Sequence, residues 1–187
     1  MGPRMVLITA RIISLLSLDI KSPKPFNGVM EDQVSAAVKV APKPQPELTT
    51  LACLIGMAAP LDGTWMFENG MRLNLNGCSI APTAMGKELT LTVARKVAES
   101  ANAEILGRPA SGQGLEDALT DKTGMLCTID EVGHFFKNMN DERAGHQVEL
   151  ANNLLQLFTG SSRDTYRCRV KSGTDPKTLK HPCLSIY

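Results

Sequence analysis

The residues best suited to chemistry lie in two short stretches, and the first joins an apolar segment to a helical pattern. It reads Ala81-Pro82-Thr83-Ala84-Met85-Gly86-Lys87-Glu88 and follows the apolar residues 73–80. A strand that ends in a tight loop of small residues, with Gly-Lys at the far end and a helix directly after it, is typical of loops that bind nucleotide triphosphates. The stretch therefore predicts a degenerate P-loop, or Walker A motif, for ATP.

Each part of this loop has a physical role. The backbone N–H groups of residues 83–88 would surround the β-phosphate, and the helix N-terminus would add its positive end. Gly86 lets the backbone approach closely, and Lys87 would reach the β- and γ-phosphate oxygens as a compact cation. An ordinary strand-to-helix turn has the same outline, so that alternative stays open.

Two positions depart from the usual G-x-x-x-x-G-K-[ST] pattern. Ala81 stands where the first glycine belongs, and Glu88 stands where a hydroxyl normally binds magnesium. An alanine fits there when its φ is negative. The Glu88 carboxylate leaves three interpretations open: it binds the metal itself, it repels the triphosphate, or it points away from the site.

The second stretch is an apolar strand that ends in two acids. It reads Met125-Leu126-Cys127-Thr128-Ile129-Asp130-Glu131, and the tip of such a strand is where an open α/β sheet binds its ligand. Asp130 would hold Mg²⁺, directly or through water, and Glu131 would orient and deprotonate the attacking water, as in a Walker B motif. A helix N-cap followed by a first-turn acid is the alternative for the pair alone. Found together in this order, the two stretches favour nucleotide binding.

Composition limits the possible functions. The chain has 187 residues, enough for one domain with a substantial core, and its 43% apolar and 21% charged content fits a soluble globular protein. The formal net charge of +1 gives no general attraction to nucleic acid or membrane. The five cysteines form no C-x-x-C pair and the three histidines lack metal-ligand spacing, which predicts reduced, structural cysteines in a cytoplasmic protein.

The N-terminal residues differ in character from the rest of the chain. Residues 5–20 are apolar, but Arg11 interrupts them, no small-x-small cleavage site follows, and the run is too short to span a bilayer. We expect a short element that packs on the body or on a partner, and no membrane partner. Prolines recur between residues 21 and 47, which predicts an extended linker, with a brief helix or strand over residues 31–40 as a possibility.

The expected division of the chain is an N-terminal segment with a linker, 1–47, and a partial P-loop domain, 48–187. Periodicity and turn residues predict the following elements of that domain: helices over 49–58, 90–101, 111–119 and 141–158, strands over 103–106, 125–129, 165–171 and 181–187, and a loop over 132–140. Alternating strands and helices predict an α/β fold with a mainly parallel sheet between helices. The extra strand between the two motif strands is typical of RecA/AAA-like ATPases with a catalytic glutamate, and Glu131 agrees with that class.

Two further features carry interpretations of their own. Trp65, the only tryptophan, is expected to make a core or edge contact rather than to touch a base. Basic and apolar residues alternate over 165–171. That stretch is either the solvated face of a hairpin or a surface for a nucleic-acid backbone or for the γ-phosphate of a neighbouring subunit.

Residues 48–187 resemble the N-terminal portion of the ATPase domain in a family of phage, prophage and plasmid proteins related to replicative helicases and primase-helicases. The resemblance rests on five segments in order, of which the acidic one with its Gly-His continuation is the most specific: 51–56, 81–87, 107–115, 129–135 and 182–186. Residues 1–47 have no counterpart in it. The chain ends where the family has a polar sensor residue and further strands, so the resemblance implies a fold that is incomplete at the C-terminus.

The resemblance implies Mg²⁺-dependent ATP hydrolysis in a helicase-like DNA replication protein, between neighbouring subunits of a ring and on single-stranded DNA. It assigns triphosphate binding to Ala84, Met85, Gly86 and Lys87. It assigns metal binding to Asp130 and water activation to Glu131. Glu88 departs from the family pattern and affects the expected metal affinity. Two other hypotheses remain: a nucleotide-binding module without turnover, and a non-functional gene fragment.

Overall fold

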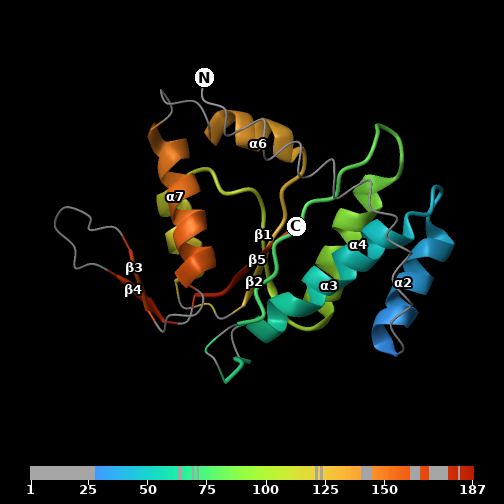
Figure 1. Cartoon of the computed structure of the whole chain (residues 1–187), viewed down its shortest axis with the longest axis horizontal. Coiled ribbons are helices and arrows are strands. Elements are labelled where there is room, and N and C mark those ends of the chain that lie inside the picture. Colours follow the sequence, from blue (N-terminus) through green and yellow to red (C-terminus); the bar gives the residue numbers. More distant parts are fainter. Residues whose placement is uncertain are drawn as a thin grey trace.

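A small parallel sheet lies between two groups of helices in the computed structural model of the chain (Figure 1). The structure describes residues 28–62, 65–68, 70, 72–120, 122, 124–139, 145–160, 165–168, 177–180 and 182–187. The sheet contains β1 (Glu104–Leu106), β2 (Met125–Cys127) and β5 (Leu184–Ile186), in the order β1-β2-β5. Both strand pairs are parallel, so the predicted α/β class with a parallel sheet is confirmed.

The segment before the candidate loop runs beside β5 without forming a full strand. Asn76 makes a single parallel bridge to Ile186, whose amide donates to Leu75 O at 3.0 Å and to Asn76 Oδ1 at 3.1 Å. Gly77 N then donates to Ile186 O at 2.9 Å. Asparagine and glycine have low strand propensity, and the Asn76 side chain competes for the same donor. Residues 73–80, predicted as a strand, therefore follow β5 as an irregular segment.

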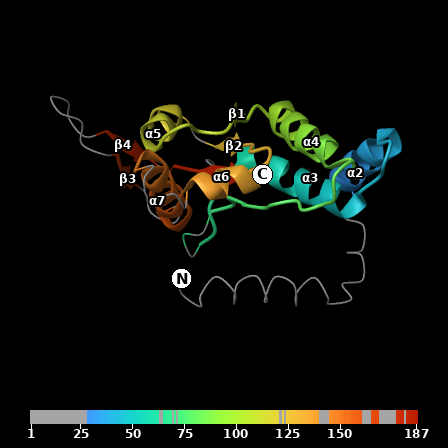
Figure 2. The same cartoon turned by 90° about the horizontal axis from the view of Figure 1, so that it is seen from above.

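Helices cover both faces of the sheet, as two perpendicular views show (Figure 1 and Figure 2). Helices α2, α3 and α4 lie on one side, α5 and α7 lie on the other, and α6 lies near the upper edge in Figure 1. The six helices of the described residues are α2 (Val29–Val40), α3 (Pro46–Asp62), α4 (Lys87–Ser100), α5 (Gly112–Leu119), α6 (Val132–Met139) and α7 (Gly145–Gly160). None of these six is both long and apolar enough to cross a membrane.

The core beneath α3 and α4 uses small residues that let the two helices approach closely. A Cβ added to Gly56 of α3 would lie 2.7 Å from Ala94 O and 3.0 Å from the Val97 Cβ of α4. Leu126, the middle residue of β2, and Met30 of α2 belong to the same apolar cluster. The helix that precedes α3 is therefore part of the packed body.

The opposite face of the sheet holds a second apolar cluster with a buried carboxylate. Met125 and Cys127 of β2 point into this cluster, on the side opposite to Leu126, as the alternation of side chains along a strand requires. Glu116 of α5 is 3% exposed, and Tyr166 Oη donates to its Oε1 at 3.1 Å. This hydrogen bond offsets part of the cost of burying the carboxylate.

The extended linker predicted between residues 21 and 47 is wrong where helices lie, whereas the brief helix left open for residues 31–40 is confirmed. Helix α2 occupies most of the described part of this range, and α3 already begins at Pro46. Met30 and Val34 lie one helical turn apart and pack against the α3/α4 cluster, which stabilises α2 despite the neighbouring prolines. The apolar residues 5–20 lie outside the described residues.

The loop predicted over residues 132–140 is also wrong, because α6 fills nearly all of it. Val132, Phe135 and Met139 recur at helical spacing and contact the second apolar cluster. Both phenylalanines of this stretch were expected to pack: Phe135 is buried, whereas Phe136 is exposed, with its ring centroid 6.2 Å from that of Phe135. The turn residues that suggested a loop are outweighed by this apolar stripe.

Helix α7 occurs where residues 141–158 predict one, but it buries a different face. Leu150 and Leu157 are buried, whereas Phe158, expected inside, is exposed. The buried face also carries Asn153, whose Nδ2 donates to the buried carboxylate of α5 at 3.3 Å. The buried face of this helix therefore includes a polar contact that apolar periodicity alone cannot reveal.

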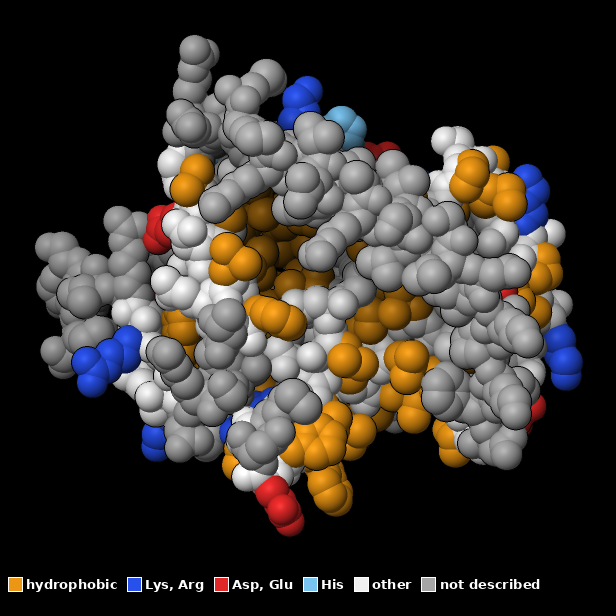
Figure 3. Space-filling view, viewed as in Figure 1, with side chains coloured by type: hydrophobic (Ala, Val, Ile, Leu, Met, Phe, Trp, Pro, Cys, Tyr) orange, Lys and Arg blue, Asp and Glu red, His pale blue; other side chains and the backbone are white. Residues whose placement is uncertain are grey.

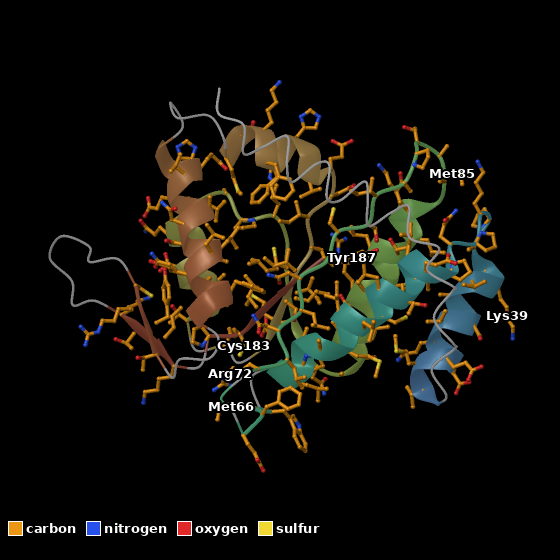
Figure 4. All side chains as sticks on the ribbon, in the orientation of Figure 1. Lys39, Met66, Arg72, Met85, Cys183 and Tyr187 are labelled. Atoms are coloured by element: carbon orange, nitrogen blue, oxygen red, sulfur yellow. The ribbon has the colours of Figure 1, made fainter. Side chains whose placement is uncertain are left out.

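The tryptophan contact predicted for Trp65 is wrong, because its side chain is 64% exposed. Trp65 follows α3 in a connection closed by an antiparallel bridge between Met66 and Arg72. Met66 and Phe67 are exposed as well. Figure 3 shows apolar side chains gathered at the lower margin of the molecule, where Figure 4 labels Met66.

A separate antiparallel pair joins β3 (Thr165–Arg167) and β4 (Thr178–Lys180). Tyr166 is buried and Arg167 is exposed, as the alternating pattern predicts. The described part of the basic stretch is therefore a hairpin with one solvated face. Residues 169–171 of the same stretch lie outside the described residues.

Candidate functional site

Both predicted motifs lie at one rim of the sheet. A line of paired residues crosses it from Leu106 through Cys127 and Ile186 to Asn76. All four segments run in the same direction, so the loop after Asn76 and the acids after Cys127 emerge at the same edge. Strand β5 lies between the segment that contains Asn76 and strand β2. These two segments are therefore two strand spacings, or about 10 Å, apart.

The chain leaves this rim toward opposite faces of the sheet. The candidate loop leads into α4 on one face, whereas β2 leads through α6 to α7 on the other (Figure 1). In open α/β sheets, ligands bind outside the carboxyl ends of the strands, at the point where the connections diverge in this way. The topology therefore marks the rim above β5 as the expected ligand position.

The loop contains two left-handed residues just before α4, a feature that anion-binding nests share. Ala84 has φ 63° and Gly86 has φ 81°, so two left-handed residues alternate just before α4. Successive N–H groups in such a turn converge on one point, where they bind an anion. Gly86 is the N-cap residue of α4, and no side chain caps the first N–H groups of the helix, which is the end that binds anions.

Backbone strain is concentrated in the two motifs. Among the described residues, the non-glycine residues with positive φ are Ala84, Asn102 and Glu131. A left-handed non-glycine residue costs roughly 1–2 kcal/mol, and such strain gathers at functional sites. Two of these three residues, Ala84 and Glu131, lie in the loop and in the acidic pair. The fold therefore tolerates backbone strain at both motifs.

The two acids do not form the N-cap arrangement that was the alternative interpretation. An N-cap carboxylate accepts from an amide two or three residues further on. Asp130 Oδ1 instead accepts from the amide of the next residue, Glu131, at 2.8 Å, and α6 begins only at Val132. His134 N donates to Glu131 O at 3.0 Å, which anchors the turn. Both carboxylates are exposed at the rim.

The side chains of the loop differ in exposure. Lys87 and Glu88, the first two residues of α4, are exposed, as are Pro82, Thr83 and Ala84. Ala81, Met85 and Gly86 are half-buried. Figure 4 shows Met85 beyond the N-terminal end of α4. The charged groups of the loop therefore reach solvent at the same rim as the two acids.

A chain of hydroxyl groups, absent from the predicted site, connects α4 with the centre of the sheet. Tyr187 Oη donates to Thr90 Oγ1 at 2.7 Å, and Thr90 Oγ1 donates to Lys87 O at 2.6 Å. Ser79 Oγ lies 2.6 Å from Tyr187 Oη and is the donor in that pair, because the tyrosine proton is already used. Tyr187 lies near the middle of the molecule, between the strands and α4 (Figure 4).

The backbone of Tyr187 joins the same residue to the acidic strand. Its amide donates to Cys127 O, and its carbonyl accepts from Ile129 N, both at 2.9 Å. Ile129 directly precedes Asp130. The structure therefore connects the candidate loop to the acidic turn through one tyrosine, and the only signal of this in the sequence is a polar aromatic residue at the end of an apolar strand.

A second connection between α4 and the acidic strand was also missed. Arg95 Nε donates to Thr128 Oγ1 at 2.9 Å, and Thr128 is buried. Thr128 lies two residues before Asp130, so this hydrogen bond joins α4 to the segment that carries the acid.

No protein-family model, curated protein or solved structure matches the chain.

Proposed function

We propose that this protein binds ATP with Mg²⁺ through residues 81–88 and hydrolyses it with the help of Asp130 and Glu131. The observation that carries the proposal is the left-handed pair Ala84 and Gly86 directly before α4, at the same rim as the left-handed Glu131. A nest with uncapped helix N–H groups suits phosphate oxygens. Carboxylates one strand away suit the metal and the water that hydrolysis requires.

The binding step uses the loop and its lysine. The N–H groups of the nest and of the first turn of α4 would surround the β-phosphate, and the exposed Lys87 ammonium would reach the β- and γ-phosphate oxygens. The position of β5 between the motif segments also supports the additional-strand, RecA/AAA-like class of P-loop NTPase. We propose this class as the finer description of the fold.

The site fits Mg²⁺ as part of a nucleotide complex. The described residues contain no group of three or more His, Cys, Asp or Glu side chains that could hold a metal by themselves. Mg²⁺ commonly takes one or two carboxylates together with substrate phosphates, and Asp130 supplies an exposed carboxylate whose Oδ1 is held by the Glu131 amide. When bound, the ion neutralises charge that develops on the phosphate oxygens.

Glu131 would act as the general base. Its exposed carboxylate would accept a proton from the attacking water, and the left-handed backbone at this residue sets the direction in which its side chain leaves the chain. The resemblance of residues 48–187 to helicase-like ATPases supports a role in DNA replication. In that role the protein would form a homo-oligomeric ring on single-stranded DNA.

The experiment measures ATP binding and hydrolysis by the purified chain with Mg²⁺, with and without single-stranded DNA. Lys87→Ala weakens binding about 10- to 100-fold, as expected for lost charge-assisted hydrogen bonds. Glu131→Gln binds ATP normally and hydrolyses it roughly 100-fold more slowly or worse. Lys96→Ala, an exposed lysine on the same helix, is the control and changes neither. Wild-type protein that does not bind ATP, or that behaves as Lys87→Ala does, contradicts the proposal.

A nucleotide-binding module without turnover is the second candidate, and Glu88 favours it. Its exposed carboxylate is the second residue of α4, where a metal-binding hydroxyl is usual. Its negative charge opposes the binding of a triphosphate. The usual neutral metal ligand, a hydroxyl, is missing at this position. ATP binding without hydrolysis, in wild type and in Glu131→Gln alike, would support this candidate over the ATPase.

A further inference from the structure

The connection between α2 and α3 lies against the candidate loop through one lysine. Lys43 Nζ donates a hydrogen bond to Ala84 O at 2.8 Å. The Lys43 carbonyl oxygen lies 2.9 Å from the position that a Cβ on Gly86 would occupy. One residue therefore contacts both left-handed residues of the loop, and its backbone excludes a side chain at Gly86.

Two prolines restrict the backbone that carries this lysine. Pro42 and Pro44 flank Lys43. Proline fixes its own φ and disfavours helical geometry in the residue before it. The connection consequently loses little conformational freedom when it packs against the loop. Figure 4 shows Lys39, near the end of α2, and Met85, in the loop, on the same side of the molecule.

The acceptor atom shows which side of the loop the lysine serves. In a nest the N–H groups converge on the anion, whereas the carbonyl groups point away from it. Because Lys43 binds the carbonyl of Ala84, its ammonium lies on the outer side of the loop. There it holds the left-handed residue in place. Alanine gains more from such support than glycine would, because its Cβ disfavours positive φ.

We propose that Lys43 is a positioning residue, which clamps the loop in its anion-binding shape through the carbonyl of Ala84. The proposal rests on the proposed function, because the shape of the loop matters for triphosphate affinity. It also assigns a role to residues 41–45, which the sequence presents only as part of a linker. Changes in α2 would reach the nucleotide through this contact.

The first test measures the affinity of the full chain for a fluorescent ATP analogue with Mg²⁺. Lys43→Met weakens binding about three- to tenfold when residue 84 is alanine, as expected for one hydrogen bond from a charged donor at the surface. In the Ala84→Gly background the same substitution changes affinity by less than about twofold, because glycine holds a positive φ without support. An equal loss in both backgrounds overturns the proposal, because it means that Lys43 contacts the triphosphate directly.

Two further variants separate position from charge. Lys39→Met removes an exposed lysine at the end of α2 and leaves the affinity unchanged. Lys43→Arg keeps a charged donor and recovers most of the lost affinity. A loss in Lys39→Met as large as that in Lys43→Met overturns the proposal, because the general charge of the region then explains both.

Hydrogen–deuterium exchange without nucleotide distinguishes failure of the clamp from failure of the proposed function. The peptide of residues 84–89 exchanges faster in Lys43→Met than in wild type, because the loop opens more often. If wild type does not bind ATP, the proposed function fails. The exchange result alone then shows whether Lys43 holds the loop in its shape. If ATP binds but neither affinity nor exchange responds to Lys43→Met, the clamp is wrong and the proposed function stands.

Discussion

The phenol of Tyr187 donates a hydrogen bond to Thr90 Oγ1 at 2.7 Å, across 97 positions of the chain. Thr90 passes the connection to the carbonyl of Lys87, and the Tyr187 backbone pairs with the acidic strand on the other side. Both hydroxyls are buried with their residues. The candidate lysine and the candidate acids therefore share one buried support, which has consequences that can be measured.

Replacement of Tyr187 tests whether its hydrogen bonds affect ATP binding as well as the stability of the fold. Tyr187→Phe leaves two hydroxyls short of a partner and lowers the free energy of unfolding by about 1–2 kcal/mol. It also weakens ATP binding several-fold, because the start of α4 loses an anchor. Denaturant unfolding and ATP titration measure the two effects.

Tyr166→Phe is the matched control for that substitution. It removes one donor to the buried carboxylate of Glu116 in the other cluster, so it lowers stability without any contact to the candidate loop. Its ATP affinity stays at the wild-type value. Equal affinities in Tyr187→Phe and wild type would show that the hydroxyl chain serves stability alone.

The contact between Arg95 and Thr128 predicts coupled effects on metal use. Arg95→Met and Thr128→Val each raise the Mg²⁺ concentration needed for half-maximal hydrolysis, because the hydrogen bond fixes the strand tip that carries Asp130. The double variant is little worse than either single one, with a coupling energy of about 0.5–3 kcal/mol. Lys96→Met, on the exposed side of α4, is the control. Fully additive losses would contradict the positioning role.

The carboxylate of Glu88 lies in the first turn of α4, where a bound triphosphate would add more negative charge. We expect Glu88→Gln to strengthen binding several-fold at low salt and progressively less as salt screens the charges. Binding measured at low and at high ionic strength tests this, with Glu99→Gln, exposed at the far end of the helix, as the control. Weaker binding in Glu88→Gln would instead identify the carboxylate as a metal ligand.

Thiol reactivity reports on the integrity of the core. All five cysteines are free, and only Cys78 among them is exposed. Burial raises the pKa of the Cys53 thiol to about 11 and that of Cys127 to about 12. A thiol reagent near neutral pH therefore modifies Cys78 first, and the four buried thiols react only on unfolding. Rapid modification of Cys127 in the folded chain would contradict the described packing.

The same shifts predict a pH dependence of stability. The unfolded chain ionises its thiols near the usual pKa of 9.0, whereas the folded chain keeps Cys53 and Cys127 protonated until about 11 and about 12. The unfolded state therefore binds fewer protons in this window, and the free energy of unfolding falls as pH rises from 9. Cys127→Ala has a shallower alkaline decline than wild type in denaturant unfolding. Identical slopes would show that other groups control the decline.

The sequence predicted elements whose signals are local. Ser111 accepts a hydrogen bond from Gly114 N as the expected N-cap, and the apolar strand before Asp130 pairs in a parallel sheet. Leu115 and Leu119 are buried as their spacing indicates. Capping residues and apolar periodicity report on their own neighbourhood, so these features could be read without a structure.

The remaining parts depend on contacts between distant residues. Nothing near Lys43 in the chain indicates that its ammonium binds Ala84 O, 41 positions away. Trp65 is a large apolar residue of the kind that usually packs in a core, yet its side chain is 64% exposed. The roles of the loop and the acids in ATP chemistry stay predictions, since geometry brings them to one rim but chemistry requires a measurement.

The strand β5 lies between chain segments that are made long before it. Ile186 donates to Asn76 Oδ1 across 110 positions, and the residues of β5 also complete the pairing of β2. A ribosome releases the loop and the acids early, when no surface yet holds them side by side. The candidate loop and the acids can therefore be brought to one rim of the sheet only after residues 184–187 have been synthesised and have paired with β2 and Asn76.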